Sequence, residues 1–100
     1  MYTRQELIDK LTPILERYPI KRAALFGSYA RGEQNSDSDV DILLELDYSS
    51  ERADSIYTFW DEIEETLTIK VDVLTLGSLE FAPERFRKRI LSEMRYVYEA

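Results

Sequence analysis

The sequence lacks both cysteine and histidine, and it has only three glycines and three prolines among its 100 residues. Disulfide bonds, thiol catalysis, thiolate zinc sites and imidazole general bases are therefore excluded. Any metal ion must be held by oxygen ligands, and carboxylates suit hard ions such as Mg²⁺, Mn²⁺ and Ca²⁺. The missing side chains thus narrow the possible cofactors before any motif is considered.

Long apolar runs and an excess of positive charge are also absent. No stretch is long and apolar enough to cross a bilayer and none resembles a signal peptide, so we expect a cytoplasmic protein. Thirteen basic residues against twenty acidic ones give a net charge of −7. This balance disfavours nucleic acid as the main partner, because each neutralised phosphate needs a cationic side chain.

The length and the hydrophobic content of 44% suit one core. We therefore expect a single domain over residues 1–100. A chain of this size can fold without disulfide bonds or a structural metal ion, but it has no residues left to form a further large lobe. If the function needs such a lobe to bind another molecule, we expect a partner protein to supply it.

The first predicted helix opens with a capping box formed by Thr3 and Glu6. Apolar residues then recur at helical spacing as far as Tyr18. Pro13 lies inside this pattern and cannot donate a backbone hydrogen bond. We therefore expect a kink there, or a break with Thr12 capping the second piece.

Three further helices are predicted from their start signals and apolar stripes. They are a short helix capped by Ser28 and ending at Arg31, a helix capped by Ser49 or Ser50 with Ala53, Phe59, Trp60 and Ile63 in its apolar stripe, and a last helix with Pro83 in its first turn and Phe86, Ile90, Met94 and Val97 inward. The stripe with Phe59 is expected to be core.

Short apolar segments between these helices predict three strands, over residues 23–26, 40–46 and 69–76, with an exit turn at Gly77-Ser78. The alternation of helices and strands predicts an α/β fold, in which a small mixed or parallel three-stranded sheet packs with about four helices.

Three aspartates are predicted to lie on strands that can share one face of this sheet. Because side chains alternate along a strand, Asp39 and Asp41 point to one side and Val40 to the other. The same alternation turns Asp72 away from its apolar neighbours. If its strand pairs with the second one, three carboxylates meet on one face.

Such an arrangement is unfavourable without a cation, since two like charges about 5 Å apart repel by roughly 3 kcal/mol at an effective dielectric near 20. Two divalent ions about 3.5 to 4 Å apart would clamp the attacking and leaving oxygens of an in-line phosphoryl displacement. The three carboxylates therefore predict a site for two hard divalent ions, with Mg²⁺, Mn²⁺ and Ca²⁺ all still open. Gly27 and Ser28 would supply the other half, because a glycine lets the backbone approach a phosphate and the serine adds a hydroxyl donor.

Gly27-Ser28, ten intervening residues and then Asp39-Val40-Asp41 match the signature G-S-x10-D-x-D. In this signature the chain resembles the DNA polymerase beta-like nucleotidyltransferase superfamily, and Asp72 falls where the third carboxylate of that superfamily is expected. The chain length, the fuller motif over residues 27–32 and the ending over residues 95–99 look like the minimal nucleotidyltransferase (MNT) family. The resemblance covers nearly the whole chain and implies the nucleotidyltransferase fold.

The resemblance also implies a Mg²⁺-dependent transfer of AMP from ATP to a hydroxyl. Members of the family are commonly antitoxins that modify a tyrosine of a HEPN-domain ribonuclease toxin, and such a partner would supply the lobe that is missing here. Carried over to this chain, Asp39 and Asp41 would ligate the metal that bridges the triphosphate. Asp72 would complete the second metal site and orient or deprotonate the acceptor hydroxyl, while Gly27 and Ser28 would grip the triphosphate.

Several of these residues also have a structural interpretation. Asp39 and Asp41 could be ordinary acids at the start of a strand, and Asp72 could pair with Lys70. Arg31 could form a salt bridge or a helix C-cap contact instead of binding the triphosphate. Asp37 could cap its loop or act as an outer ligand of the site. The last helix carries a basic cluster that could stay in solvent, dock a partner or contact phosphate, formed by Arg85, Arg87, Lys88, Arg89 and Arg95.

Two other functions stay open at this point. The chain could be a non-catalytic antitoxin that binds and occludes the toxin. It could also modify itself on one of its seven tyrosines, of which Tyr96 and Tyr98 lie near the end of the sequence.

Overall fold

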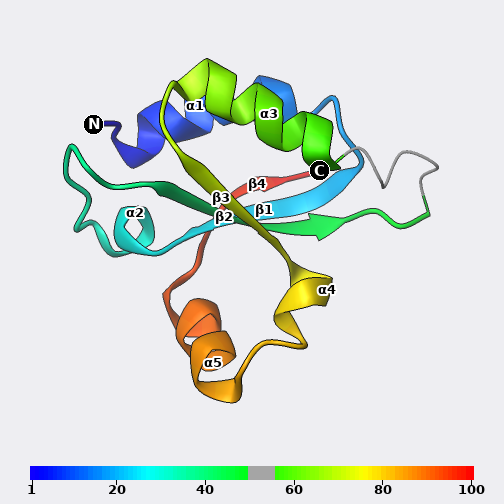
Figure 1. Cartoon of the computed structure of the whole chain (residues 1–100). Coiled ribbons are helices and arrows are strands. Elements are labelled where there is room, and N and C mark those ends of the chain that lie inside the picture. Colours follow the sequence, from blue (N-terminus) through cyan, green and yellow to red (C-terminus); the bar gives the residue numbers. More distant parts are fainter. Residues whose placement is uncertain (50–55) are drawn as a thin grey trace.

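A computed structural model of the chain, which describes residues 1–49 and 56–100, contains one four-stranded sheet and five helices in these residues. Figure 1 shows α1 and α3 side by side over one face of the sheet and α4 and α5 over the other. In chain order the elements are α1 (Arg4–Leu15), β1 (Ile20–Phe26), α2 (Ser28–Arg31), β2 (Val40–Leu46), α3 (Ile56–Leu67), β3 (Val71–Thr75), α4 (Leu76–Leu79), α5 (Glu84–Glu93) and β4 (Arg95–Glu99).

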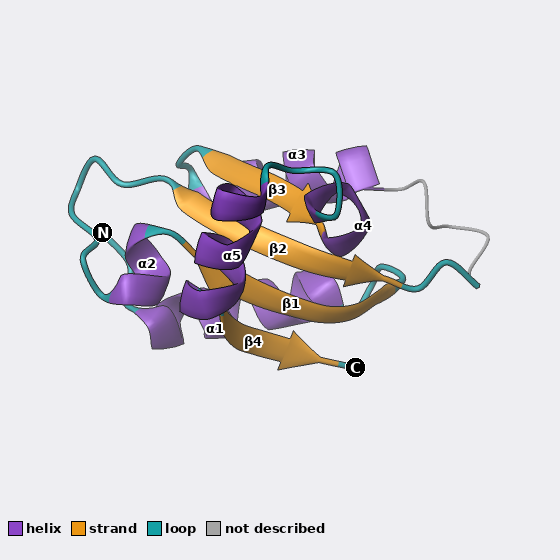
Figure 2. Ribbon diagram, turned by 90° about the horizontal axis from the view of Figure 1, so that it is seen from below, coloured by secondary structure: helices purple, strands orange, loops and turns teal. Residues whose placement is uncertain are grey.

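The strands lie in the order β3-β2-β1-β4, so the sheet is mixed. β1 runs antiparallel to both β2 and β4, whereas β2 and β3 are parallel. A parallel pair requires a crossover connection, and α3 provides it on the side of the sheet where α1 lies (Figure 1). This connection brings the first residues of β2 and β3 to the same end of the sheet. Figure 2 shows α2 at that end and α5 crossing the face turned toward the viewer.

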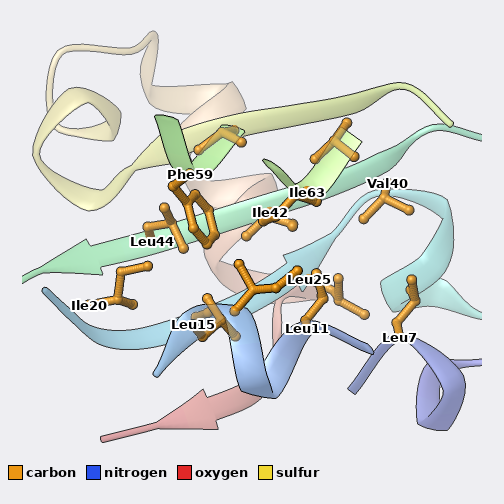
Figure 3. Packing of buried hydrophobic residues seen from close by; sticks show 14 of the residues in the cluster. Leu7, Leu11, Leu15, Ile20, Leu25, Val40, Ile42, Leu44, Phe59 and Ile63 are labelled. Carbon is orange, nitrogen blue, oxygen red and sulfur yellow. The ribbon is translucent and has the colours of Figure 1, made fainter. Parts of the chain in front are cut away.

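The interior is divided into two cores by the sheet. The larger core lies between the sheet and α1 with α3, and Figure 3 shows its close packing around Leu25, Ile42 and Phe59. The smaller core lies under α4 and α5 and consists of Ala24, Phe26, Leu43, Leu79 and Ile90. One face of the sheet is therefore well covered, and the other is covered only in part.

The predicted α/β class with a mixed sheet is confirmed, but the sheet has four strands and not three, because residues 95–99 form a fourth strand instead of continuing the last helix. The described residues also form five helices and not about four. α5 ends at Glu93, and the backbone of Met94 is extended (φ −61°, ψ 148°). Met94 packs against the smaller core as expected, but Val97 packs against the larger one on the opposite face. The helical spacing of the apolar residues had concealed a change from helix to strand.

A second difference lies at the start of β1, which begins at Ile20 and not at residue 23. Lys21 and Arg22 make this part look like a polar loop in the sequence. In the structure Arg22 donates to Glu45 of β2 at 2.6 Å and its guanidinium lies 5.1 Å from the centre of the Tyr96 ring. These cross-strand contacts keep a charged residue in the sheet.

The helix starts agree with the sequence analysis in part. Thr3 and Glu6 form the predicted capping box, and α1 continues through Pro13 to Leu15, so the alternative of a break is wrong. The hydroxyl of Thr12 donates to the carbonyl of Ile8 and caps no second piece.

The predicted cap of α2 and the predicted turn after β3 differ from the structure. The N-cap of α2 is Gly27 and no side-chain capping bond forms there, so Ser28 is the first helical residue and not the cap. The turn predicted at Gly77-Ser78 is a short helix, α4, with its own capping box at Thr75. Ser49 donates to Asp47, and the alternative cap Ser50 and the stripe residue Ala53 lie outside the described residues. No helix in the described part of the chain is both long and apolar enough to pass through a membrane.

Ile90 is the one fully buried α5 side chain of the smaller core (0% exposed), and the next residue, Leu91, is 44% exposed. We expect Ile90→Ala to lower the free energy of unfolding by about 2–4 kcal/mol, because it removes buried methyl groups and leaves a cavity. Leu91→Ala serves as the matched control and should cost under about 1 kcal/mol. Urea denaturation followed by the fluorescence of the single tryptophan, Trp60, measures both. Equal losses would show that Ile90 does not anchor α5.

Candidate active site

Two of the three predicted aspartates face each other across the parallel strands. Asp41 and Asp72 are partners in the register of β2 and β3. They share the side of the sheet on which Leu43 packs in the smaller core, because side chains two residues apart on a strand point the same way. Both carboxylates therefore lie on the partly covered face, where α5 crosses the sheet (Figure 2).

The electrostatics of this pair are unfavourable. Partial burial, as the largest cause, and neighbouring negative charges together raise the pKa of Asp41 from its ordinary value of 3.8 to about 6. The other causes are, in decreasing order, the negative charge of Asp72, a hydrogen bond that the two carboxyl groups share, and the charges of Asp39 and Glu93. Asp41 thus lies in an environment that resists its negative charge, which is the condition that a bound cation relieves.

Asp39 lies just before β2 and contributes charge to the pair, but it forms an ion pair with Lys70 at 3.8 Å. The sequence analysis had considered Lys70 as a partner of Asp72, and the structure places it at Asp39 instead. Among the residues that the structure describes, no group of three or more acidic side chains is arranged so that it could hold a metal ion. Joint metal binding by all three aspartates stays a prediction.

Gly27 follows β1 and lies directly against Asp41, because Phe26 is the partner of Asp41 in the register of β1 and β2. Its backbone (φ 72°, ψ −153°) belongs to a region that only glycine adopts readily. A Cβ at this position would lie 2.2 Å from Oδ2 of Asp41. The glycine is therefore required twice, once for its backbone angles and once for the space that the carboxylate fills.

Arg31 closes α2 and forms ion pairs with two carboxylates, Glu33 and Glu93. The salt-bridge interpretation of this arginine is confirmed, and a contact with triphosphate stays a prediction. Glu93 is only 11% exposed, and its other oxygen accepts the N–H of Gly27 at 3.1 Å. Burial acts to raise the pKa of Glu93, but the hydrogen bonds from Arg31 and Gly27 outweigh it, so that its pKa is lowered and the carboxylate stays ionised.

A cavity of about 420 Å³ opens beside the two facing carboxylates. Its walls are largely apolar, and its volume lies within the range of small-molecule sites. The charged lining residues are Asp41, Asp72 and Arg89, and the others are Phe26, Gly27, Trp60, Val73, Leu74 and Phe86. The aromatic walls suit a planar ring held next to the carboxylates.

The remaining candidates are placed as follows. Ser28 is half-buried at the first position of α2, next to Gly27. Asp37 is exposed, and the loop around it is ordered by a bond from the N–H of Asn35 to Ser38. Trp60 is only partly buried, and its indole N–H donates to the carbonyl of Val71.

The basic residues of α5 largely contact their own surroundings. Lys88 pairs with Glu84 at 3.0 Å, Arg87 donates to the carbonyl of Glu80, and Arg89 lies 3.9 Å from Glu93. These contacts favour the interpretation that most of the basic cluster stays in solvent, whereas Arg89 also lines the cavity.

Sequence reasoning missed Glu93, Trp60 and Phe86 as parts of this site. Glu93 lies 66 residues from Gly27 in the sequence and belongs to a helix full of charges, so no local signal distinguishes it. Trp60 and Phe86 follow the apolar stripes of their helices and look like core residues. The packing of α3 and α5 on opposite faces of the sheet brings both rings to one cavity.

The sequence matches the nucleotidyltransferase domain family over residues 8–97. It is 42% identical to a candidate protein adenylyltransferase of Methanocaldococcus jannaschii over 88 residues, which cover 88% of this chain and 90% of the relative. It is 34% identical to the protein adenylyltransferase MntA of Thermococcus cleftensis, and this match covers 97% of the chain and 98% of the relative.

Among solved structures, the chain superposes on one chain of the complex of a tri-AMPylated Shewanella oneidensis HEPN toxin with MNT antitoxin. The TM-score is 0.68 with 17% sequence identity, and the match covers 98% of this chain and 74% of the other. At this identity the likeness shows that the fold is shared.

Gly27 and Gly32 offer a comparison for testing the close approach of Asp41, since both have a φ of 72°, although ψ is −153° at Gly27 and 22° at Gly32. At Gly32 nothing lies within 4 Å of an added Cβ, so Gly32→Ala should cost about 1–2 kcal/mol of stability from the backbone alone. Gly27→Ala should cost about 3 kcal/mol or more, because its backbone lies in a region that essentially only glycine adopts and because the methyl group also collides with Asp41. Urea denaturation of both variants checks this. Similar losses at the two positions would contradict the role assigned to the carboxylate.

The raised pKa of Asp41 makes the stability of the fold depend on pH. A carboxyl group whose pKa is higher in the folded state stabilises the fold below its unfolded pKa, near 3.8, and loses this contribution as the pH rises through about 6. We therefore expect Asp41→Asn to be more stable than the wild type at pH 8, relative to their difference at pH 4, by about 1–2 kcal/mol after allowance for solvent screening.

Thermal unfolding without divalent metal at the two pH values measures this effect. Asp61→Asn, which makes the same change at an exposed position of α3, is the control and should show no such dependence. A stability difference for Asp41→Asn that does not change between pH 4 and pH 8 would refute the assignment.

Proposed function

Because the chain belongs to the nucleotidyltransferase domain family, we propose that it transfers AMP from ATP to a hydroxyl group of a protein partner. The observation that carries this proposal is the facing pair Asp41 and Asp72 beside the glycine turn, in a cavity with aromatic walls. The names of its relatives, which are protein adenylyltransferases, support AMP as the transferred group and a protein as its acceptor.

The residues at the site fit a divalent metal ion. Asp41 and Asp72 are oxygen ligands of the type that Mg²⁺ prefers, and their mutual repulsion is relieved by positive charge. Asp39 would complete the set once its side chain leaves Lys70. When bound, Mg²⁺ or Mn²⁺, as one ion or two, supplies charge that offsets the charge developing on the phosphate oxygens.

Different residues of this chain then bind the triphosphate and accept the proton. Gly27, Ser28 and Arg31 hold the triphosphate through a backbone N–H, a hydroxyl and a guanidinium group. Asp72 orients the acceptor hydroxyl and takes its proton. The acceptor oxygen forms a bond to the α-phosphorus, the bond from that phosphorus to the bridging oxygen breaks, and pyrophosphate leaves with the electron pair.

The partner that we propose is a HEPN-domain toxin, and the acceptor is one of its tyrosines. The fold is shared with the complex that contains a tri-AMPylated HEPN toxin and its MNT antitoxin, which supports this choice. The aromatic walls formed by Phe26, Trp60 and Phe86 suit either an adenine base or a tyrosine ring. The net charge of −7 also favours a protein over a nucleic acid as the acceptor.

The test mixes the purified chain with ATP, Mg²⁺ and the purified protein that the neighbouring gene encodes, and looks for a mass increase of AMP units on that protein. Asp41→Asn and Asp72→Asn should each reduce the initial rate about a hundredfold or more, since the loss of a metal ligand removes several kcal/mol of transition-state stabilisation. Asp61→Asn, the same change at an exposed site, should leave the rate unaltered.

Retained transfer in the Asp41 variant would refute the role of the carboxylate pair. If the wild type blocks the toxin but adds no mass under any divalent metal, the chain acts by occlusion. A mass increase on the isolated chain would point to self-modification.

A further inference from the structure

Glu93 occupies the place where the phosphates are proposed to bind. One of its carboxylate oxygens accepts the backbone N–H of Gly27 at 3.1 Å, and the other accepts Nη1 of Arg31 at 2.9 Å. In the proposed function, these same two donors bind the triphosphate. A single side chain at the end of α5 therefore takes both of them.

The Glu93 carboxylate and a phosphate group have similar hydrogen-bonding chemistry. A carboxylate and a phosphate both present paired oxygens that accept charge-assisted hydrogen bonds from guanidinium and backbone N–H groups. Glu93 is nearly buried, at 11% exposed, and Nε of Arg89 lies 3.9 Å from one of its oxygens. The surroundings of Glu93 are thus positive and enclosed, as an anion site requires.

A phosphate and the Glu93 carboxylate cannot use these donors together. Each N–H direction accommodates one acceptor, and two anions side by side repel each other. Glu93 also adds to the negative potential around Asp41. Nucleotide binding at Gly27 therefore requires the carboxylate to move away.

We propose that Glu93 competes with the triphosphate for Gly27 and Arg31 and thereby lowers the affinity of the site for nucleotide. This inference rests on the proposed function, because it assumes that nucleotide binds at these donors. Without nucleotide, the carboxylate neutralises Arg31 and ties the end of α5 to the turn after β1. With nucleotide, the phosphates replace the carboxylate, and the junction between α5 and β4 is released from that turn.

The test measures binding of the non-hydrolysable analogue AMP-PNP with Mg²⁺ to the isolated chain by calorimetry. Glu93→Gln keeps the shape of the side chain but removes its charge, and it should bind about tenfold tighter, the equivalent of about 1.4 kcal/mol. Glu93→Asp keeps the charge but is shorter by one methylene group. It should also bind more tightly, because the carboxylate no longer reaches both donors.

Glu33→Gln is the matched control, because Glu33 pairs with the same arginine but makes no bond to Gly27 among the contacts described above. Its side chain is 62% exposed, so its ion pair is screened by solvent. We expect this variant to change the affinity by less than about twofold. Thermal unfolding of all variants verifies that the fold is retained.

A direct readout comes from the three glycines of the chain. In a spectrum of protein labelled with ¹⁵N-glycine, the Gly27 amide signal should shift in Glu93→Asp, which breaks its bond to the carboxylate. It should shift in the wild type when AMP-PNP is added. The signal of Gly77, which lies on α4, serves as the internal reference.

Tighter binding in both Glu93 variants, with little change in Glu33→Gln, supports the competition. Equal or weaker binding in the Glu93 variants overturns it and leaves the proposed function standing, since Glu93 would then position Arg31 for the nucleotide. An equal gain in Glu33→Gln also overturns it, because charge alone would explain the effect. If neither the wild type nor any variant binds the analogue, both the competition and the proposed function fail.

Discussion

The repulsion between two carboxylates held in register on parallel strands is the constraint on which the rest of the site depends. Asp41 and Asp72 cannot turn away from each other, because the pairing of β2 with β3 fixes which face each side chain occupies. Their neighbours adapt to this pair. The absence of a Cβ at Gly27 leaves room for the carboxylate of Asp41, and a cavity lies beside the two acids. The fold thus carries an unfavourable charge pattern at one place and compensates for it with apolar packing elsewhere.

Much of the fold could be predicted from local patterns. The bounds of β2 (Val40–Leu46) and the capping box of α1 agree with the sequence analysis, because both depend on residues that are adjacent or one turn apart. The fourth strand could not be found in this way. The spacing of Phe86, Ile90 and Met94 continues a helical pattern, and the pairing of residues 95–99 with β1 depends on contacts across most of the chain. The aromatic and β-branched residues of that segment are typical of strands, but the helical period masked them.

The site divides in the same way. The motif spacing predicted Gly27, Asp39, Asp41 and Asp72 near one another, and the structure brings Asp41, Asp72 and Gly27 into direct contact or register while Asp39 pairs with Lys70. The bonds of Glu93 to Gly27 and Arg31 could not be foreseen. They form because β4, which follows α5 after a short connection, pairs with β1. The residues next to Glu93 in the sequence do not predict this pairing.

The division of the interior into two cores has a consequence for how the molecule opens. Five side chains fill the smaller core, and two short helices cover it, whereas the larger core ties α1 and α3 to the strands. Local unfolding begins where the fewest apolar contacts are lost. The layer of α4 and α5 can therefore loosen while the sheet and the opposite layer stay folded. A bulky molecule that approaches the carboxylates over this layer meets the side of the sheet that fewer buried side chains hold in place, and a shift of this layer leaves the strands that carry the carboxylates in place.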